Sequence, residues 1–127
     1  MVSLFTNYFL IRPQNLNHAG TLFGGTMMAW ADEMAFVAAS LTYPGCTFVT
    51  KVVREFNFVS GPIEGDIVKI TAQVLGRGRS SVSVAVHASN ARTEEEIFHT
   101  EAVLVNARDG KSRPIPEDAD RSEPPRE

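Results

Sequence analysis

Hydrophobic and polar residues alternate along two stretches in the second half of the chain, residues 66–75 and 80–90. Alternation with period two puts apolar side chains on one face of a strand and polar side chains on the other. We therefore expect two half-buried strands joined by a hairpin at residues 76–79. Their apolar faces are formed by Val68, Ile70, Ala72 and Val74 in the first strand and by Val82, Val84, Val86 and Ala88 in the second.

Three further stretches have the composition of strands. Residues 2–11 mix Val, Leu, Phe, Tyr and Ile before Pro13, and residues 47–59 are rich in Val, Phe and Thr before the Gly61-Pro62 pair. Branched and aromatic residues are enriched in strands, whereas proline and glycine end them. With residues 97–106 as the last strand, we expect five strands in all.

Residues 24–41 are the one long segment typical of a helix, and Tyr43, Pro44 and Gly45 follow it as a stop signal. Apolar residues lie on nearly every face, as in helices that are buried on all sides. A helix of this length is only ~25 Å long and ~10 Å wide, so one chain cannot cover both the sheet and the outer side of the helix. We predict an α+β fold, with an antiparallel five-stranded sheet on one central helix, and a homodimer in which a second copy completes the burial.

Composition limits the partners that this chain can have. Its 127 residues, 43% hydrophobic and 21% charged, are typical of one globular domain, and no apolar stretch reaches the ~20 residues that span a bilayer. A net charge of −3 without a basic run argues against nucleic-acid binding. The lack of a secretory signal and the single Cys46 favour a cytoplasmic protein. We expect residues 1–116 to form the domain and residues 117–127 to be a flexible tail.

The start of the predicted helix has the features of an anion-binding site. Gly24 and Gly25 let a ligand approach the first backbone N–H groups, which carry the positive end of the helix dipole. A carbonyl that becomes an oxyanion needs such a donor about 3 Å away. The Gly25 amide, or its neighbour, is therefore a candidate oxyanion donor, although a glycine pair also serves to permit a tight turn.

An acidic pair, Asp32 and Glu33, lies two turns further along the helix. The residues one turn away from Asp32 are apolar, namely Met28, Ala29, Ala35 and Phe36. Desolvation disfavours a charged carboxylate, which suits a base that works near neutral pH. A structural carboxylate with a polar partner is the alternative. Glu33 follows about 100° around the helix, so we assign it to an interface or to solvent.

Short motifs occur in a fixed order over roughly residues 10–116: Asn17-x-x-Gly20-x-Leu22-Phe23-Gly24-Gly25, Asp32-Glu33, Phe48-Val49-Thr50, Phe56, Gly65-Asp66, Gly78-Arg79-Ser80-Ser81 and Arg113-Pro114-Ile115-Pro116. Each is weak alone, but the ordered set is specific. In this order they resemble the hotdog-fold acyl-CoA thioesterases of the bacterial broad-specificity and mammalian cytosolic type.

The resemblance implies a hotdog fold in which the sheet wraps the helix, and dimers, often arranged as trimers of dimers, with two active sites at the subunit interface. It also implies hydrolysis of acyl-CoA to a fatty acid and free CoA, without a metal, a cofactor or a Ser/His/Asp triad. Asp32 matches the family's catalytic aspartate, which would activate water or attack the thioester directly. Asn17 matches its catalytic asparagine, although a loop asparagine also makes local turns.

The resemblance further implies which residues line the CoA channel. Arginine and serine beside flexible backbone suit phosphate groups, although a charged hairpin is the commonest meaning of such a stretch. The candidate CoA contacts are Val49, Thr50, Lys51, Arg77, Gly78, Arg79, Ser80, Ser81 and Arg113, with Lys111 nearby. For the acyl chain the candidates are Met28, Trp30 and Phe56, for which a place in the core is the alternative.

Two other functions remain as alternatives. His18 lies 14 residues before Asp32, a separation similar to that of the His and Glu in hotdog hydroxyacyl thioester dehydratases, but these enzymes carry prolines before their acid. A non-catalytic module that binds acyl-CoA is the second alternative, and the combination of Asn17, Gly25 and Asp32 argues against it. His87 and His99 lie in separate strands without ligand spacing, so we expect no metal site.

One helix cannot supply both the oxyanion donor and the base. Gly24 and Asp32 are eight residues apart, about 12 Å along a helix, whereas donor and base must both lie within ~3 Å of the reacting atoms. If two helices lie antiparallel across a dimer axis, the glycine end of one comes beside Asp32 of the other. We therefore predict a composite site, with Asn17 and the glycines from one subunit and Asp32 from its partner.

Overall fold

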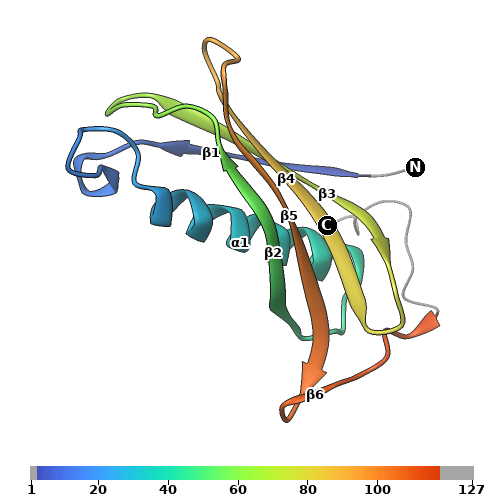
Figure 1. The fold of residues 1–127 in the computed structure, drawn as a ribbon. Helices are drawn as coiled ribbons and strands as arrows, with labels where there is room; N and C mark the ends of the chain where they lie inside the picture. The colour runs from blue at the N-terminus through green and yellow to red at the C-terminus, as the bar shows by residue number, and fades with distance from the viewer. Residues whose placement is uncertain (1–2, 118–127) are drawn as a thin grey trace.

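The computed structural model describes residues 3–117, in which six strands and one long helix form (Figure 1). The elements are β1 (Leu4–Leu10), α1 (Gly24–Thr42), β2 (Phe48–Phe58), β3 (Ile67–Arg77), β4 (Ser81–Asn90), β5 (Glu96–Arg108) and β6 (Lys111–Ser112), with a 3-10 helix at Pro13–Asn15 between β1 and α1. The five predicted strands and the helix are confirmed, and their ends differ from the predicted ones by at most two residues. The short β6 was not predicted. It pairs with the end of β5 through a turn at Asp109 and Gly110, whose positive φ angles suit a two-residue hairpin.

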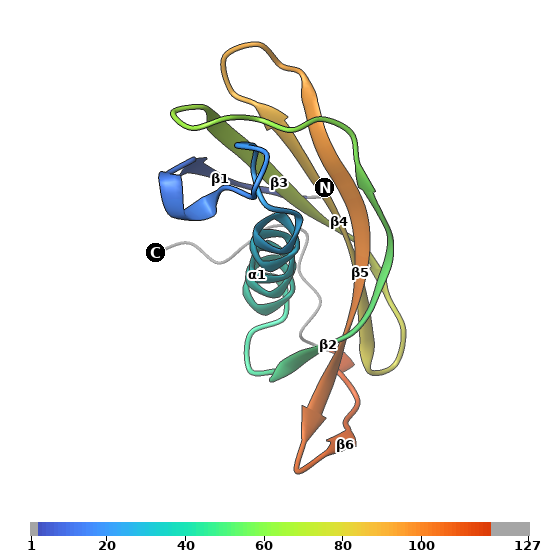
Figure 2. The ribbon, with the colours of Figure 1, turned by 60° about the vertical axis from the view of Figure 1, so that its left-hand side comes forward.

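All strands pair antiparallel, in the order β1-β3-β4-β5-β2. The predicted hairpin joins β3 to β4, whereas β2, which follows the helix in sequence, crosses to the far edge and pairs with β5. The sheet curves around α1, as Figure 2 shows when viewed along the helix. The two edges, β1 and β2, therefore flank the helix.

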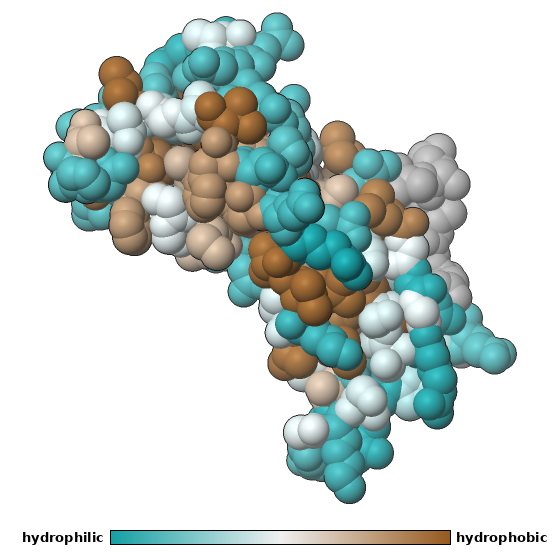
Figure 3. All heavy atoms as spheres, viewed as in Figure 1, coloured by the Kyte–Doolittle hydropathy of each residue, from teal (hydrophilic) through white to brown (hydrophobic). Residues whose placement is uncertain are grey.

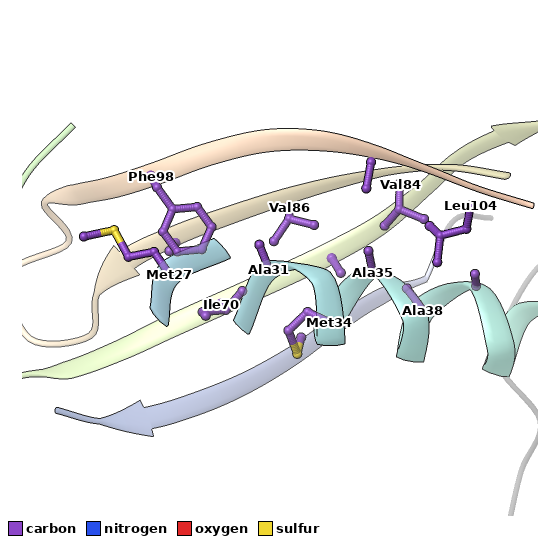
Figure 4. Packing of buried hydrophobic residues seen from close by; sticks show 14 of the residues in the cluster. Met27, Ala31, Met34, Ala35, Ala38, Ile70, Val84, Val86, Phe98 and Leu104 are labelled. Carbon is purple, nitrogen blue, oxygen red and sulfur yellow. The ribbon is translucent and has the colours of Figure 1, made fainter. Parts of the chain in front are cut away.

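The core lies between α1 and the face of the sheet that curves around it (Figure 4). Alternate residues of β3 and β4 are fully buried, as predicted, including Ile70, Val84 and Val86. Small side chains on α1, such as Ala35 and Ala38, let the helix backbone come close to the strands. Phe98 on β5 is the largest fully buried side chain. The period-two pattern thus identified the side of each strand that faces the helix.

The opposite face of α1 is exposed in the single chain, as expected of a helix whose outer side one chain cannot cover. Met28, Phe36 and Leu41 each have 45–46% of their surface exposed. Hydrophobic side chains are also exposed on the edge strand β2, where Figure 3 shows them gathered. Val53 pairs with the buried Ala102 and so lies on the side of the sheet that faces α1, whereas Val49 and Val52 pair with Val105 and Val103 on the outer face. Exposed apolar side chains on α1 and the neighbouring side of β2 mark an interaction site.

The segment after β6 folds back onto the domain. The Arg113 N–H donates to the Asn106 carbonyl and the Ile115 N–H to the Arg79 carbonyl, both at 2.8 Å. Ile115 is only 3% exposed, so the segment packs on the core. The predicted tail, residues 117–127, lies outside the described residues apart from Glu117.

Candidate active site

Asn17 lies in a tight turn just before α1, and its side chain closes that turn. The Asn17 Oδ1 accepts the N–H groups of Ala19 at 2.8 Å and Thr21 at 3.1 Å, and its Nδ2 donates to the Thr21 hydroxyl at 3.0 Å. The backbone supports the same turn, because the Asn17 N–H donates to the Thr21 carbonyl at 2.7 Å. An amide nitrogen carries two protons, and within residues 3–117 only Thr21 receives one. The second Nδ2 proton of Asn17 is therefore available to a ligand, and the turn fixes the position of the amide.

The helix begins at Gly24 without a side-chain cap, because the preceding residue is Phe23. The N–H groups of Thr26 and Met27 donate to the Phe23 carbonyl at 3.0 and 3.1 Å. Among the described residues, no acceptor receives the N–H groups of Gly24 and Gly25. These two amides are the donors that an anionic ligand would meet at the positive end of the helix dipole.

An added Cβ at either glycine would crowd an aromatic ring. A Cβ on Gly25 would lie 2.6 Å from the ring of Phe23, and a Cβ on Gly24 would lie 3.2 Å from the ring of Phe58. The two aromatic rings thus pack directly on the glycine backbone. Phe58 comes from the end of β2, so its contact with Gly24 was not visible from sequence spacing.

Asp32 lies on the exposed face of α1, where its carboxylate accepts a hydrogen bond from the hydroxyl of Thr50 on β2. A β-bulge at Lys51 follows Thr50 immediately, because Thr50 pairs with Leu104 and Val52 with Val103. Bulges re-aim neighbouring side chains and are common beside functional sites. Asp32 therefore has a polar partner, and Thr50, predicted only as a CoA contact, is the residue that holds it.

The two groups of candidate residues stay apart within one chain. Asn17 and Gly24 border a pocket of about 330 Å³ with Met27, Phe58 and Ser60, and Asp32 is not among its lining residues. Asp32 lies about 12 Å further along the helix, beside the apolar face of α1 and β2. Glu33, next to Asp32, is exposed to solvent in the single chain.

The basic residues predicted to contact CoA gather near the other end of α1. The Arg77 guanidinium lies 5.6 Å from the centre of the Tyr43 ring and donates to the Ile115 carbonyl at 3.2 Å. Arg77 thus holds the C-terminal segment against the residue that follows the helix. Arg79 and Arg113 remain exposed. The bond between Ile115 and Arg79 joins the two segments that carry them.

The three histidines differ in their surroundings. His18 is exposed in the turn before α1. His87 and His99, far apart in sequence, pair directly across β4 and β5, and both contact the Glu96 carboxylate, at 3.1 and 2.9 Å. Within residues 3–117, no group of three His, Cys, Asp or Glu side chains is placed to hold a metal ion. No helix of that same part of the chain has the length and apolar character needed to cross a membrane.

Comparisons with known proteins agree on one family. A family model described as the thioesterase superfamily matches residues 19–97. The acetyl-coenzyme A thioesterase of Mus musculus is 36% identical over 77 residues, which cover 61% of this chain and 14% of that protein. The chain therefore spans only a small part of the curated relatives that it matches.

Solved structures that are similar over most of the chain include two thioesterases. An acyl-CoA hydrolase from Staphylococcus aureus, in complex with butyryl coenzyme A and coenzyme A, has a TM-score of 0.78 at 30% identity. The match covers 89% of this chain and 69% of the hydrolase chain. A hexameric hotdog-fold thioesterase of Campylobacter jejuni has a TM-score of 0.80 at 26% identity, and the match covers 89% of this chain and 90% of that thioesterase. The predicted hotdog fold is thereby confirmed. Since the family model covers more than half of the chain, including the helix start, Asp32 and Thr50, the chain belongs to the thioesterase superfamily.

Proposed function

We propose that this protein hydrolyses acyl-CoA thioesters to a carboxylic acid and free CoA. The observation that carries the proposal is the pair of Asp32 and Thr50, a carboxylate held by a hydroxyl on the open face of α1, in a chain of the thioesterase superfamily. The acyl-CoA hydrolase from Staphylococcus aureus has also been studied as variants in which one aspartate or one threonine is replaced by alanine. Asp32 and Thr50 of this chain are likewise an aspartate and a threonine.

In the proposed reaction, the Asp32 carboxylate removes a proton from a water molecule, and the oxygen of that water attacks the thioester carbonyl carbon. The carbonyl oxygen becomes an oxyanion, which the Gly25 N–H, with the Gly24 N–H beside it, stabilises. When the tetrahedral intermediate collapses, the C–S bond breaks and the CoA thiolate leaves. The proton held by Asp32 returns to the sulfur, so the products are a carboxylic acid and a thiol.

The site that performs this reaction needs two copies of the chain. The separation of about 12 Å between the glycine amides and Asp32 is too long for one substrate carbonyl. We place Asn17 and Gly25 of one subunit opposite Asp32 and Thr50 of its partner. The remaining Nδ2 proton of Asn17 then hydrogen-bonds to the attacking water or to the carbonyl oxygen.

The apolar face of α1 and β2 is the surface that brings the copies together. Met28 and Phe36 are exposed one turn from Asp32 on α1, and Val53 is exposed on β2, the strand that carries Thr50. Burial of such side chains contributes about 25 cal/mol per Å² of apolar area, and it also removes water from around Asp32. We propose a homodimer as the minimum unit. Assembly into a trimer of dimers is supported by hexameric relatives.

For the CoA moiety we propose the exposed arginines of the two joined segments, Arg79 and Arg113. Both are exposed, and the Ile115–Arg79 hydrogen bond ties their segments together. Arginine binds phosphate through two parallel N–H groups. Lys51 at the β2 bulge is a further cation on the strand that carries Thr50. Arg77 acts indirectly, because its guanidinium already lies against Tyr43 and Ile115.

Thiol release from a panel of acyl-CoA thioesters, monitored with a chromogenic thiol reagent, tests the proposal. The comparison uses the wild type, Asp32→Asn and the matched control Glu33→Gln, which neutralises the neighbouring exposed carboxylate. We expect Asp32→Asn to lose at least about 100-fold in kcat, as removal of a general base typically does, and Glu33→Gln to keep wild-type activity.

Three outcomes would contradict the proposal. Equal kcat values in Asp32→Asn and the wild type would remove Asp32 from the mechanism. Binding of acyl-CoA without any thiol release would indicate a binding module. Hydration of an enoyl-CoA without thiol release would indicate a dehydratase that uses His18.

A further inference from the structure

The pocket at the start of α1 has an apolar side, formed by Leu22, Met27 and Phe58, to which the proposed chemistry assigns no role. Its volume is about 330 Å³. The side chains of Leu22 and Met27, which are 2% and 3% exposed, line it from the core. The outer wall is Phe58, which pairs with the buried Phe98 across β2 and β5 and so faces the helix.

This pocket contains no charged side chain. It is lined by Asn17, Thr21, Leu22, Gly24, Met27, Phe58, Val59, Ser60 and Gly61. The phosphate groups of CoA require cations or several N–H donors, and the arginines proposed for them lie near the other end of α1, where Arg77 covers Tyr43. The pocket therefore suits a neutral, apolar part of a ligand, as ligand pockets with a few polar groups generally do.

Phe58 limits the size of this space. Its ring packs against Gly24, where an added Cβ would lie 3.2 Å away. On its other side the ring contacts Phe56 at a centroid distance of 4.6 Å, and Phe56 contacts Phe98 at 4.8 Å. Phe58 itself is 52% exposed. A supported but exposed ring of this kind can be replaced without removing a core residue.

We infer that this pocket receives the acyl group of the thioester and that Phe58 determines which acyl groups fit. The inference rests on the proposed function, because Asn17 and Gly24 line the same pocket. When the carbonyl oxygen of the thioester accepts the Gly25 N–H, the acyl chain begins at the mouth of this pocket. A short acyl chain lies within this open pocket beside Phe58, and the remainder of a longer chain, such as palmitoyl, extends beyond it.

The test is kcat/KM for butyryl-, octanoyl- and palmitoyl-CoA in the wild type, Phe58→Ala and Phe58→Trp. Tyr8→Ala is the matched control, since it removes an aromatic ring that is 58% exposed and lies on β1, outside this pocket. One methylene more or less in an apolar pocket changes the ratio of kcat/KM between two substrates about 10-fold or more. We expect Phe58→Ala to raise the octanoyl to butyryl ratio at least about 10-fold, Phe58→Trp to lower it by a similar factor, and Tyr8→Ala to leave it unchanged.

A ratio that stays within about 2-fold of the wild type in both Phe58 variants, with thermal unfolding unchanged, would overturn the inference. So would an equal shift in Tyr8→Ala. If Phe58→Ala fails to fold, Phe58→Trp and Phe58→Leu provide the same comparison, because both keep a large apolar side chain. Failure of the proposed function is distinct, because the wild type would then release no thiol from any of the three substrates.

Discussion

Replacement of Thr50 by valine tests whether the hydroxyl that contacts Asp32 matters for catalysis. Thr50→Val keeps the β-branched shape that suits the edge strand but removes the only donor that the structure aims at the Asp32 carboxylate among residues 3–117. A hydrogen bond to a charged group contributes about 1.5–3 kcal/mol, and each 1.36 kcal/mol corresponds to about tenfold in rate. We therefore expect kcat to fall about 10- to 150-fold.

Stability should change much less than activity. Thr50 and Asp32 are both exposed in the single chain, and exposed substitutions usually change the free energy of unfolding by about 0.5 kcal/mol or less. The assay is thiol release from butyryl-CoA, with thermal unfolding measured in parallel. Thr50→Ser, which keeps the hydroxyl, is the control and should retain most of the activity. Wild-type kcat in Thr50→Val, or equal losses in the valine and serine variants, would refute the reasoning.

Three other predictions concern the interface, the core and the cysteine. Val53→Asp puts a charge on the apolar side of β2 and should convert the proposed dimer to an inactive monomer in analytical ultracentrifugation, because an unpaired buried charge costs several kcal/mol. Leu4→Asp lies on the opposite face of the sheet and should stay dimeric, and the same mass for both variants would argue against this interface. Phe98 is fully buried, so Phe98→Ala should lower the free energy of unfolding by about 3–5 kcal/mol in urea denaturation. A loss under about 1 kcal/mol would contradict the central place of Phe98 in the core. Burial raises the pKa of the Cys46 thiol, although the charge of Arg77 opposes this rise. Less thiolate is therefore present at pH 7, and alkylation of Cys46 by iodoacetamide should be slower than that of free cysteine. A faster reaction would contradict a raised pKa.

The strands and the helix were predictable because their signals are local. Val84 and Val86 are both buried on the face that alternation indicated. For α1, the apolar residues on nearly every face show which side chains must leave water, and the width of one helix predicts that a second copy covers part of them. Met28 and Phe36 are exposed in the single chain, as that prediction requires.

The sequence motifs indicated the candidate residues but not the contacts between them. Asp32 and Gly25 stand in recognisable motifs. Thr50 reaches Asp32 only because β2 pairs with β5 across the sheet and bulges at Lys51. Phe58 meets Gly24 through the same long-range pairing. Such contacts depend on the register between distant strands, which a local pattern does not contain. Asn17 forms the local turn that was the alternative to a catalytic role, and its catalytic role stays a prediction.

Subunit mixing tests most directly the central claim, that each active site combines Asn17 and Gly25 of one subunit with Asp32 of the other. Asn17→Ala and Asp32→Ala chains, each inactive alone, are unfolded together, refolded at equal concentrations and assayed for thiol release. In a two-fold dimer with composite sites, a mixed dimer has one site with both changes and one intact site. Since about half of the dimers are mixed, we predict recovery of about a quarter of wild-type activity per subunit. No recovery, with mixed dimers demonstrated by mass spectrometry, would contradict the account.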